Sequence, residues 1–233
     1  MPEPVRPTRR ELLRLLATVG AVTASGTLLD ACGTSTRPAA STTPAATPAA
    51  AHPGALIMII RHGEKPGALG DDEGVDPDGK SDNHALTARG WDRARALVPL
   101  FAPASGQLHP GLARHTAIYA SGGNHKQGER TRQTVTPLAT QLGITLNTQY
   151  SKGQEATMAQ EVARRTEPTL ICWQHGELPA IAAAIPNVTP AAPTHWPGSR
   201  FDLIWSLTPA AGGWAFQQIP EMIMAGDSNQ SIA

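Results

Sequence analysis

The chain has 233 residues, a formal net charge of zero and 40% hydrophobic residues, of which few are aromatic. This length suits one domain of ordinary size plus a terminal tail, and it is short for two domains. The balance of charge argues against a nucleic-acid-binding protein, against attraction to an anionic membrane surface and against an acidic solvating tail.

Residues 1–32 have the pattern of a bacterial export signal. The twin-arginine pair Arg9-Arg10 precedes a weakly apolar stretch over 15–29, and the segment ends in a small residue followed by Cys32. This order is typical of lipoprotein signals, in which the cysteine is lipidated and becomes the new N-terminus. We therefore expect export to the cell envelope, with contact to the outer side of the cytoplasmic membrane only through a lipid anchor on Cys32. An uncleaved anchor helix is the alternative, although the apolar stretch is shorter than the ~20 residues of a membrane span.

Residues 33–54 are nearly all Ala, Pro, Thr and Ser. Such a composition cannot bury a core and favours extended chain, so it predicts a linker between Cys32 and a folded domain over 55–233. Cys172, the second of the two cysteines, is then left without an intrachain partner. It lies in the apolar run 169–173, where we expect a buried structural thiol.

The remaining chain alternates strand and helix patterns. Residues 55–60 form a continuous apolar run, which is typical of a strand buried on both faces of a parallel sheet. Further strands are expected over 116–120, 144–146, 170–173, 201–207 and 214–219, and helices over 87–101, 129–142, 154–165 and 177–185. This order predicts an α/β fold, a three-layer α/β/α sandwich with a mostly parallel sheet.

Polar residues follow three of the expected strands directly. Arg61 and His62 follow the first strand, Ser121 follows the second, and His175 follows the strand over 170–173. Ligands of such sheets bind beyond the carboxyl ends of the strands, so the sequence predicts a pocket at this edge.

The segment Arg61-His62-Gly63 resembles the RHG signature of the histidine-phosphatase superfamily, which is also called phosphoglycerate mutase-like. Three further segments resemble motifs of that family in the same order: Leu86–Ala94 is similar to LTxxGxxRA, Ser121 with Arg130–Thr134 to S…RxxQT, and Trp173–Gly176 to a strand that ends in a second histidine. Each piece is short, but the ordered set covers roughly residues 55–186. The resemblance implies a phosphoglycerate mutase-like fold.

The resemblance also implies a phosphomonoester hydrolase that needs no metal or other cofactor and acts on a small phosphorylated substrate. His62 would attack phosphorus and become phosphohistidine, which water would then hydrolyse. Arg61, Arg130 and His175 would hold the phosphoryl oxygens. A phosphate monoester carries about two negative charges near neutral pH, and the fixed fork of arginine donors suits its oxygens.

A general acid must also give a proton to the leaving alkoxide. In mutase-like members a glutamate supplies it from the segment before the second histidine, and Glu155 lies in that segment. Glu177 is the second choice, as acid or substrate ligand, although a glutamate that opens a helix can simply complement the helix N-terminus. Ser121 either contacts substrate or shapes a turn, and Glu64 is expected to orient the signature loop.

Two loops depart from the family pattern. The stretch over 122–128 is longer than the usual turn before RxxQT, and the loop over 66–85 is rich in Asp and Gly. Neither resembles the segment that grips a phosphorylated sugar acid in mutases, which favours hydrolysis over mutase activity.

Two other functions compete with the hydrolase. One is a non-catalytic module that binds phosphorylated ligands on the same fold. The other is a metal-dependent hydrolase, but its candidate ligands show no HExxH or similarly tight spacing: His62, His84, His125 and His175.

Overall fold

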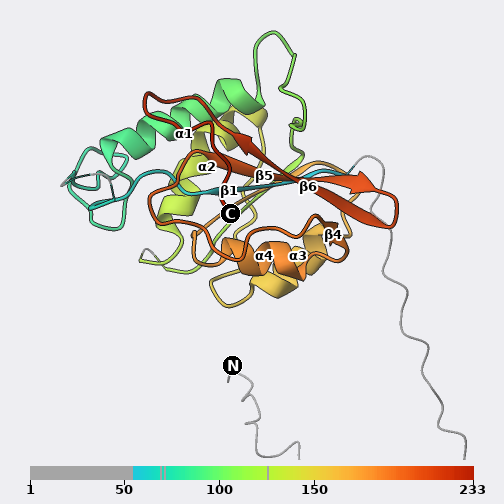
Figure 1. Cartoon of the computed structure of the whole chain (residues 1–233). Coiled ribbons are helices and arrows are strands. Elements are labelled where there is room, and N and C mark those ends of the chain that lie inside the picture. The colour runs from blue at the N-terminus through green and yellow to red at the C-terminus, as the bar shows by residue number, and fades with distance from the viewer. Residues whose placement is uncertain (1–54, 69, 71, 125) are drawn as a thin grey trace, which may run out of the picture. The chain divides into compact units, whose positions relative to one another are not determined.

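The computed structural model describes residues 55–233 except 69, 71 and 125, so the expected export signal, linker and Cys32 anchor lie outside the described residues. The elements follow one another in the order β1 (Ile57–Arg61), α1 (Ala88–Phe101), β2 (Ala117–Ala120), α2 (Glu129–Leu142), α3 (Glu155–Val162), β3 (Thr169–Trp173), α4 (Leu178–Ala184), β4 (Val188–Thr189), β5 (Leu203–Ala210) and β6 (Gly213–Pro220) (Figure 1).

These strands form one six-stranded sheet in the order β2-β3-β1-β5-β6-β4. Strands β2, β3 and β1 are parallel to one another, and β4 is parallel to β6. Only β5 runs antiparallel to its neighbours β1 and β6, so five of the six strands share one direction. The predicted mostly parallel sheet is confirmed.

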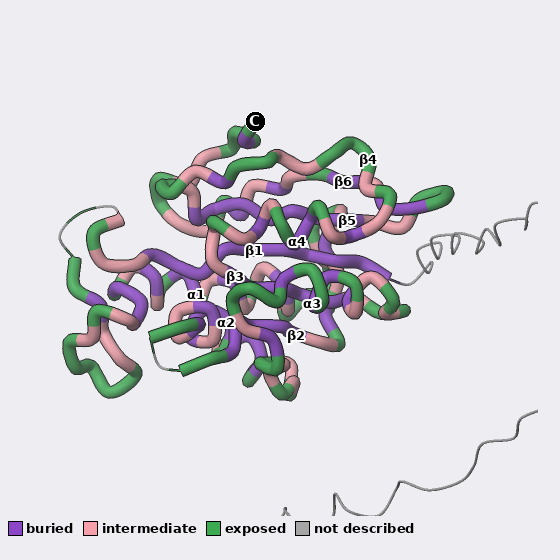
Figure 2. The backbone as a smooth tube through the Cα atoms, turned by 90° about the horizontal axis from the view of Figure 1, so that it is seen from below, coloured by how far each residue is buried: buried purple, intermediate pink, exposed green. Residues whose placement is uncertain are grey.

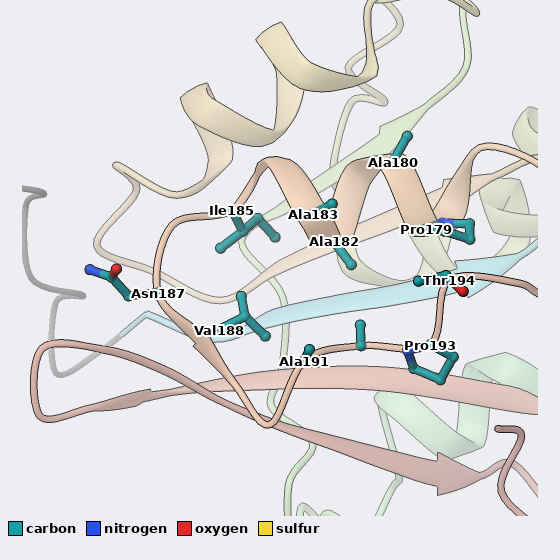
Figure 3. A pocket seen from close by; sticks show the side chains of 11 residues that line it. Pro179, Ala180, Ala182, Ala183, Ile185, Asn187, Val188, Ala191, Pro193 and Thr194 are labelled. Carbon is teal, nitrogen blue, oxygen red and sulfur yellow. The ribbon is translucent and has the colours of Figure 1, made fainter.

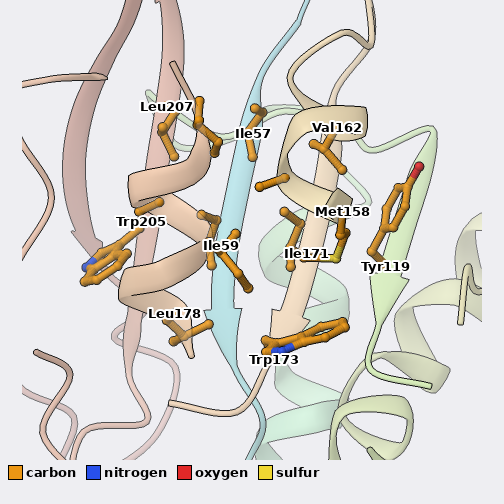
Figure 4. Close-up of a cluster of buried hydrophobic side chains, with 14 of the residues drawn as sticks. Ile57, Ile59, Tyr119, Met158, Val162, Ile171, Trp173, Leu178, Trp205 and Leu207 are labelled. Atoms are coloured by element: carbon orange, nitrogen blue, oxygen red, sulfur yellow. The ribbon is translucent and has the colours of Figure 1, made fainter. Parts of the chain in front are cut away.

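Helices cover both faces of this sheet. Ile57 and Ile59 of β1 pack with side chains of α3 and α4 on one face, a cluster shown in Figure 4. Met58 and Ile60 pack with side chains of α1 and α2 on the other face. Successive side chains of a strand point to opposite faces, so a strand covered on both sides has no polar position. This explains the continuous apolar run, and β1 and β3 are buried along their whole length (Figure 2).

The helix boundaries follow local signals in the sequence. Thr87 caps α1 as expected, since its side chain accepts a hydrogen bond from the amide of Gly90. α2 ends at Gly143, which adopts the left-handed conformation that glycine tolerates best. α3 ends earlier than predicted, because the amides of Arg164 and Arg165 bond to carbonyls three residues back and form a tighter turn.

One strand prediction is wrong, and one strand was not expected. The residues 144–146 form no strand: the pairing with β2 is a single bridge from the next residue, Asn147, to Tyr119. The side chain of Asn147 then accepts a hydrogen bond from the amide of Gln149, which turns the chain away from the sheet edge. The two-residue strand β4 was not predicted, since so short a strand has no recognisable alternation.

The thiol of Cys172 is fully buried in β3, as expected, and its burial raises its pKa well above the ordinary value. Within the described part of the chain, no helix has both the length and the apolar character needed to cross a membrane.

Candidate active site

The predicted edge of the sheet brings the expected polar residues together through strand register. Arg61 at the end of β1 is paired with Trp173 at the end of β3, and the amide of His62 continues this ladder by donating to the carbonyl of Trp173 at 3.1 Å. Ala120 of β2 is paired with Cys172. Arg61, His62, Ser121 and the residues after Trp173 therefore emerge at the same edge.

The orientation of His62 determines which ring nitrogen is free. His62 is 4% exposed, and its Nδ1 lies 2.7 Å from the carbonyl oxygen of Gly63. A carbonyl only accepts hydrogen bonds, so this contact assigns the proton to Nδ1. In the neutral ring the lone pair is then on Nε2, which is the atom available to attack an electrophile.

The surroundings of His62 favour this neutral ring. Burial lowers the pKa of His62 well below its usual value, and the charge of Arg61 lowers it further. The hydrogen bond to Gly63 acts in the opposite direction, while Arg130 and His175 contribute smaller lowering effects. The imidazole is therefore unprotonated and nucleophilic at neutral pH.

Arg61 carries donors that the described residues do not satisfy. One guanidinium nitrogen donates to the carbonyls of Gly198 and Arg200, at 2.7 and 2.8 Å, and the group lies 3.6 Å from the ring centroid of Phe201. Its Nε and second terminal nitrogen are buried and have no hydrogen-bond partner among the described residues. Burial lowers the pKa of Arg61 to about 9, against the opposing charge of Glu64. Buried unsatisfied donors next to a nucleophile are groups that an oxyanion could satisfy.

A cavity of about 190 Å³ lies in front of His62. Its lining is mostly polar, with three cationic side chains and one acidic one, and consists of His62, His84, Lys126, Gln127, Gly128, Glu129, Arg130, Thr131, Lys152 and Gln174. Arg130 is held by its Nε, which donates to the carbonyl of Ala85 at 3.1 Å, and burial lowers its pKa. Glu129, the only acid among the described residues of the lining, is paired with Arg132 at 2.7 Å.

His175 lies beside this arrangement and is half-buried. Burial lowers its pKa and the charge of Arg61 lowers it further, while Glu177 raises it. The charges of Arg61, Arg130 and His175 thus each act on the pKa of His62.

The loop after β1 is held by two further segments of the site. The amide of Gly63 donates to the hydroxyl of Thr134 at 2.8 Å, and the amide of Leu86 donates to the side chain of Gln133 at 2.9 Å. A Cβ on Gly63 would lie 2.9 Å from the carbonyl oxygen of Gly90, so the loop and α1 approach too closely for a side chain. Gln133 and Thr134 were not among the predicted site residues, although their place in the RxxQT segment was a signal.

The two candidate acids occupy different positions. Glu155 is 7% exposed, and its carboxylate accepts hydrogen bonds from the amide of Gly153 and from the indole of Trp173 at 3.0 Å. Glu177 is half-buried and forms an ion pair with Lys152, which lines the cavity. Neither glutamate is part of the cavity lining itself.

The remaining candidates are divided between the cavity and its supports. Ser121 is buried outside the lining, and its backbone amide donates to the hydroxyl of Thr131 at 3.1 Å. His84 lines the cavity, whereas His125 lies outside the described residues.

Glu64 is buried against Arg93 of α1, so it does tie the signature loop to the neighbouring helix. Among the residues that the structure describes, no cluster of three or more His, Cys, Asp or Glu could hold a metal ion.

A larger cavity of about 600 Å³ lies between α4 and the segment that follows β4 (Figure 3). It is lined by small and apolar side chains such as Ala183, Ile185, Val188 and Pro193, and it contains no titratable group. This cavity therefore offers none of the chemistry found around His62.

No family model matches the chain, and no curated protein matches it. Solved structures do resemble it. The protein histidine phosphatase SixA complexed with tungstate is 18% identical, with a TM-score of 0.41 over 71% of this chain and 97% of that one. Mycobacterial glucosyl-3-phosphoglycerate phosphatase in complex with VO3 is 13% identical, with a TM-score of 0.42 over 71% and 97%. A phosphoserine phosphatase mutant from Entamoeba histolytica, in complex with phosphoserine, is 13% identical, with a TM-score of 0.42 over 70% and 95%. These similarities are remote, so the function proposed below rests on the side chains of the site.

Proposed function

We propose that the chain is a metal-independent phosphomonoester hydrolase that acts through a phosphohistidine on His62. The observation that carries this proposal is the state of His62: a buried, neutral imidazole whose Nδ1 is tied to the Gly63 carbonyl and whose Nε2 is free, beside a cationic cavity. A nucleophile of this kind, surrounded by positive charge, suits attack on a dianionic phosphate.

The reaction takes place in two steps. In the first, Nε2 of His62 forms a bond to phosphorus, the ester P–O bond breaks, and the leaving alkoxide takes a proton from a general acid. In the second, water attacks the phosphohistidine, the P–N bond breaks, and inorganic phosphate leaves. Arg61, Arg130 and His175 donate hydrogen bonds to the phosphoryl oxygens, and the two arginines offset their charge in both steps, so the site needs no metal ion for this purpose.

Glu155 is the proposed general acid, with Glu177 as the alternative. The hydrogen bond from the indole of Trp173 holds the carboxyl of Glu155 in place. The ion pair with Lys152, which lines the cavity, holds the carboxyl of Glu177 close to the cavity. Each must move toward the ester oxygen to give its proton, because neither lines the cavity.

We also propose that the enzyme is exported and held at the outer side of the cytoplasmic membrane by a lipid on Cys32. The support is the sequence of residues 1–54, with its twin-arginine pair, its apolar stretch and its segment rich in Ala, Pro, Thr and Ser. Labelling with radioactive palmitate, compared with Cys32→Ala, tests the anchor. Label that persists in Cys32→Ala would contradict it.

The test of the hydrolase uses residues 33–233, an aryl phosphate and excess chelator. We expect turnover that survives the chelator, acid-labile phosphate on the quenched protein, and loss of both in His62→Ala. His109→Ala is the matched control, because His109 Nδ1 contacts the carbonyl of its own successor, Pro110, in the same way at 2.8 Å but at an exposed position. Absence of turnover on a broad panel of phosphate esters, with inorganic phosphate still bound, would instead indicate the non-catalytic binding module.

A further inference from the structure

The chain that follows β6 returns to the loop carrying His62. Residues 221–228, here named the C-terminal strap, are tied to this loop by a buried ion cluster centred on Arg93. We propose that the C-terminal strap is a positioning element for His62 and that Arg93 is the positioning residue through which it acts. This inference rests on the proposed function, because it assigns the strap a role in the reaction of His62.

Arg93 uses all of its guanidinium nitrogens within the cluster. Its Nε lies 3.1 Å from both carboxylate oxygens of Glu64, one terminal nitrogen donates to Glu221 at 2.7 Å, and the other donates to Asp227 at 2.7 Å and to Glu64 at 2.9 Å. The four side chains are at most 2% exposed. Arg89 adds a second contact to Glu64 at 3.2 Å. The planar guanidinium of Arg93 binds three carboxylates at once and so restricts the position of each carboxylate. The ammonium group of a lysine could not reproduce this planar arrangement of donors.

The cluster reaches His62 through one peptide unit. The carbonyl of Gly63, which accepts the hydrogen bond from Nδ1 of His62, belongs to the peptide that joins Gly63 to Glu64. Any rotation of the Glu64 backbone therefore moves the acceptor that fixes both the tautomer and the direction of the imidazole. Because Arg93 holds the Glu64 carboxylate, it limits this rotation.

The strap also reaches Arg61 from its other end. The amide of Ser228 donates to Asp202 at 2.6 Å, and the other oxygen of Asp202 accepts from Nε of Arg200 at 2.7 Å. The carbonyl of Arg200 in turn accepts from Arg61 at 2.8 Å. The strap thus connects to Arg61, directly before His62, through Arg200, and to Glu64, two residues after His62, through Arg93.

Asp227→Asn is the first variant to test, because an amide has nearly the same shape as the carboxylate but weakens the pairing with Arg93. Asp92→Asn is its matched control, since Asp92 pairs with Arg95 at 2.6 Å on the exposed side of α1. We expect Asp227→Asn to lower kcat for an aryl phosphate by about 10- to 100-fold, because small misplacements of a reacting atom have effects of this size. The affinity for inorganic phosphate should change by less than about twofold, since Arg130 and His175 stay in place. Asp92→Asn should resemble the wild type.

Two further measurements separate positioning from stability and from the proposed function. All rates are taken well below the melting temperature, and a loss of kcat that only follows the loss of folded protein would overturn the inference. Hydrogen exchange of the amides of residues 62–64 should accelerate in Asp227→Asn but not in Asp92→Asn. This measurement tests the strap even if the wild type shows no turnover, which would contradict the proposed function alone. Unchanged kcat and unchanged exchange in Asp227→Asn would overturn the positioning role, and Arg93→Lys should show the larger effect if it folds.

Discussion

The hydroxyl of Thr134 accepts a hydrogen bond from the backbone amide of Gly63 at 2.8 Å. The same hydroxyl donates to the carbonyl of Arg130, one turn earlier in α2, at 2.7 Å. One buried side chain therefore connects the loop that carries His62 to the helix that carries Arg130, and it gives the buried amide of Gly63 an acceptor.

We expect Thr134→Val to lower the free energy of unfolding by about 1–3 kcal/mol, because it leaves the Gly63 amide buried without an acceptor. Thr136→Val is the control, since the Thr136 hydroxyl makes the same bond to the carbonyl four residues earlier, at 2.8 Å, but on the exposed face of α2. Denaturant unfolding of both variants measures the difference. Equal losses in the two variants would show that the bond to Gly63 contributes nothing specific.

The low pKa of His62 predicts the acidic side of the pH profile. In the proposed mechanism the neutral imidazole is the active form, and it is the form present above the pKa of His62. Burial and the charge of Arg61 hold this pKa well below 6.5, so lowering the pH to 6.5 should not protonate His62. The ring resonances of His62, assigned by comparison with His62→Asn, should stay at their neutral positions between pH 8 and 6.5. A titration of His62 within that range would contradict the assignment of a neutral nucleophile.

The choice of general acid can be decided with leaving groups. An acid is needed for an alkyl phosphate, whose alkoxide is strongly basic, and much less for a nitrophenyl phosphate. We expect Glu155→Gln to lower kcat for an alkyl phosphate by about 100-fold or more while it changes the nitrophenyl rate by less than about tenfold. Glu177→Gln is measured in parallel. If Glu177→Gln, rather than Glu155→Gln, slows the alkyl phosphate much more than the nitrophenyl phosphate, the general acid is Glu177.

His115 should make the protein sensitive to acid. It is 3% exposed, packs on Phe101 with ring centroids 4.6 Å apart, and neither ring nitrogen has a hydrogen-bond partner among the described residues. Burial lowers its pKa to about 3, so between pH 6.5 and 3 the unfolded state binds a proton that the folded state rejects. Stability is therefore lost as the pH falls through this window.

From this residue alone we expect the protein to be about 2 kcal/mol less stable at pH 5 than at pH 7. His115→Leu should remove that difference, and urea unfolding at the two pH values measures it. The exposed His109→Leu serves as the control. An unchanged pH dependence in His115→Leu would mean that the folded protein already accepts a proton at this position.

Most of the layered architecture could be predicted because it follows from short-range pattern. The apolar run of β1, the Thr87 cap of α1 and the periodicity of α2 each depend on neighbours within a few residues of the chain. The strand expected over 144–146 failed for the opposite reason, since an apolar triplet becomes a strand only where a partner edge remains beside it. The chain there meets β2 at Asn147 alone and turns away.

The candidate site shows the same division. His62, Arg61 and His175 could be named from motif order and from their place after strands, because parallel strands bring their carboxyl ends to one edge; Arg130 could be named from motif order alone. The sequence could not show that Glu155 is hydrogen-bonded to Trp173 outside the cavity, or that Lys126 and Lys152 line it. The two lysines come from separate loops, and their positions depend on how those loops pack.

The amino-acid sequence by itself determined most of the elements that form, that β1 and β3 are covered on both faces and which residues follow them, because these properties depend on local periodicity, capping and burial. Only the tertiary structure decided the tautomer of His62, the unsatisfied donors of Arg61 and the enclosure of Glu64 by Arg93, Glu221 and Asp227. Those features join residues as many as 163 positions apart (Glu64 and Asp227). Their energies depend on burial and on distances of about 3 Å, which no pattern along the chain specifies.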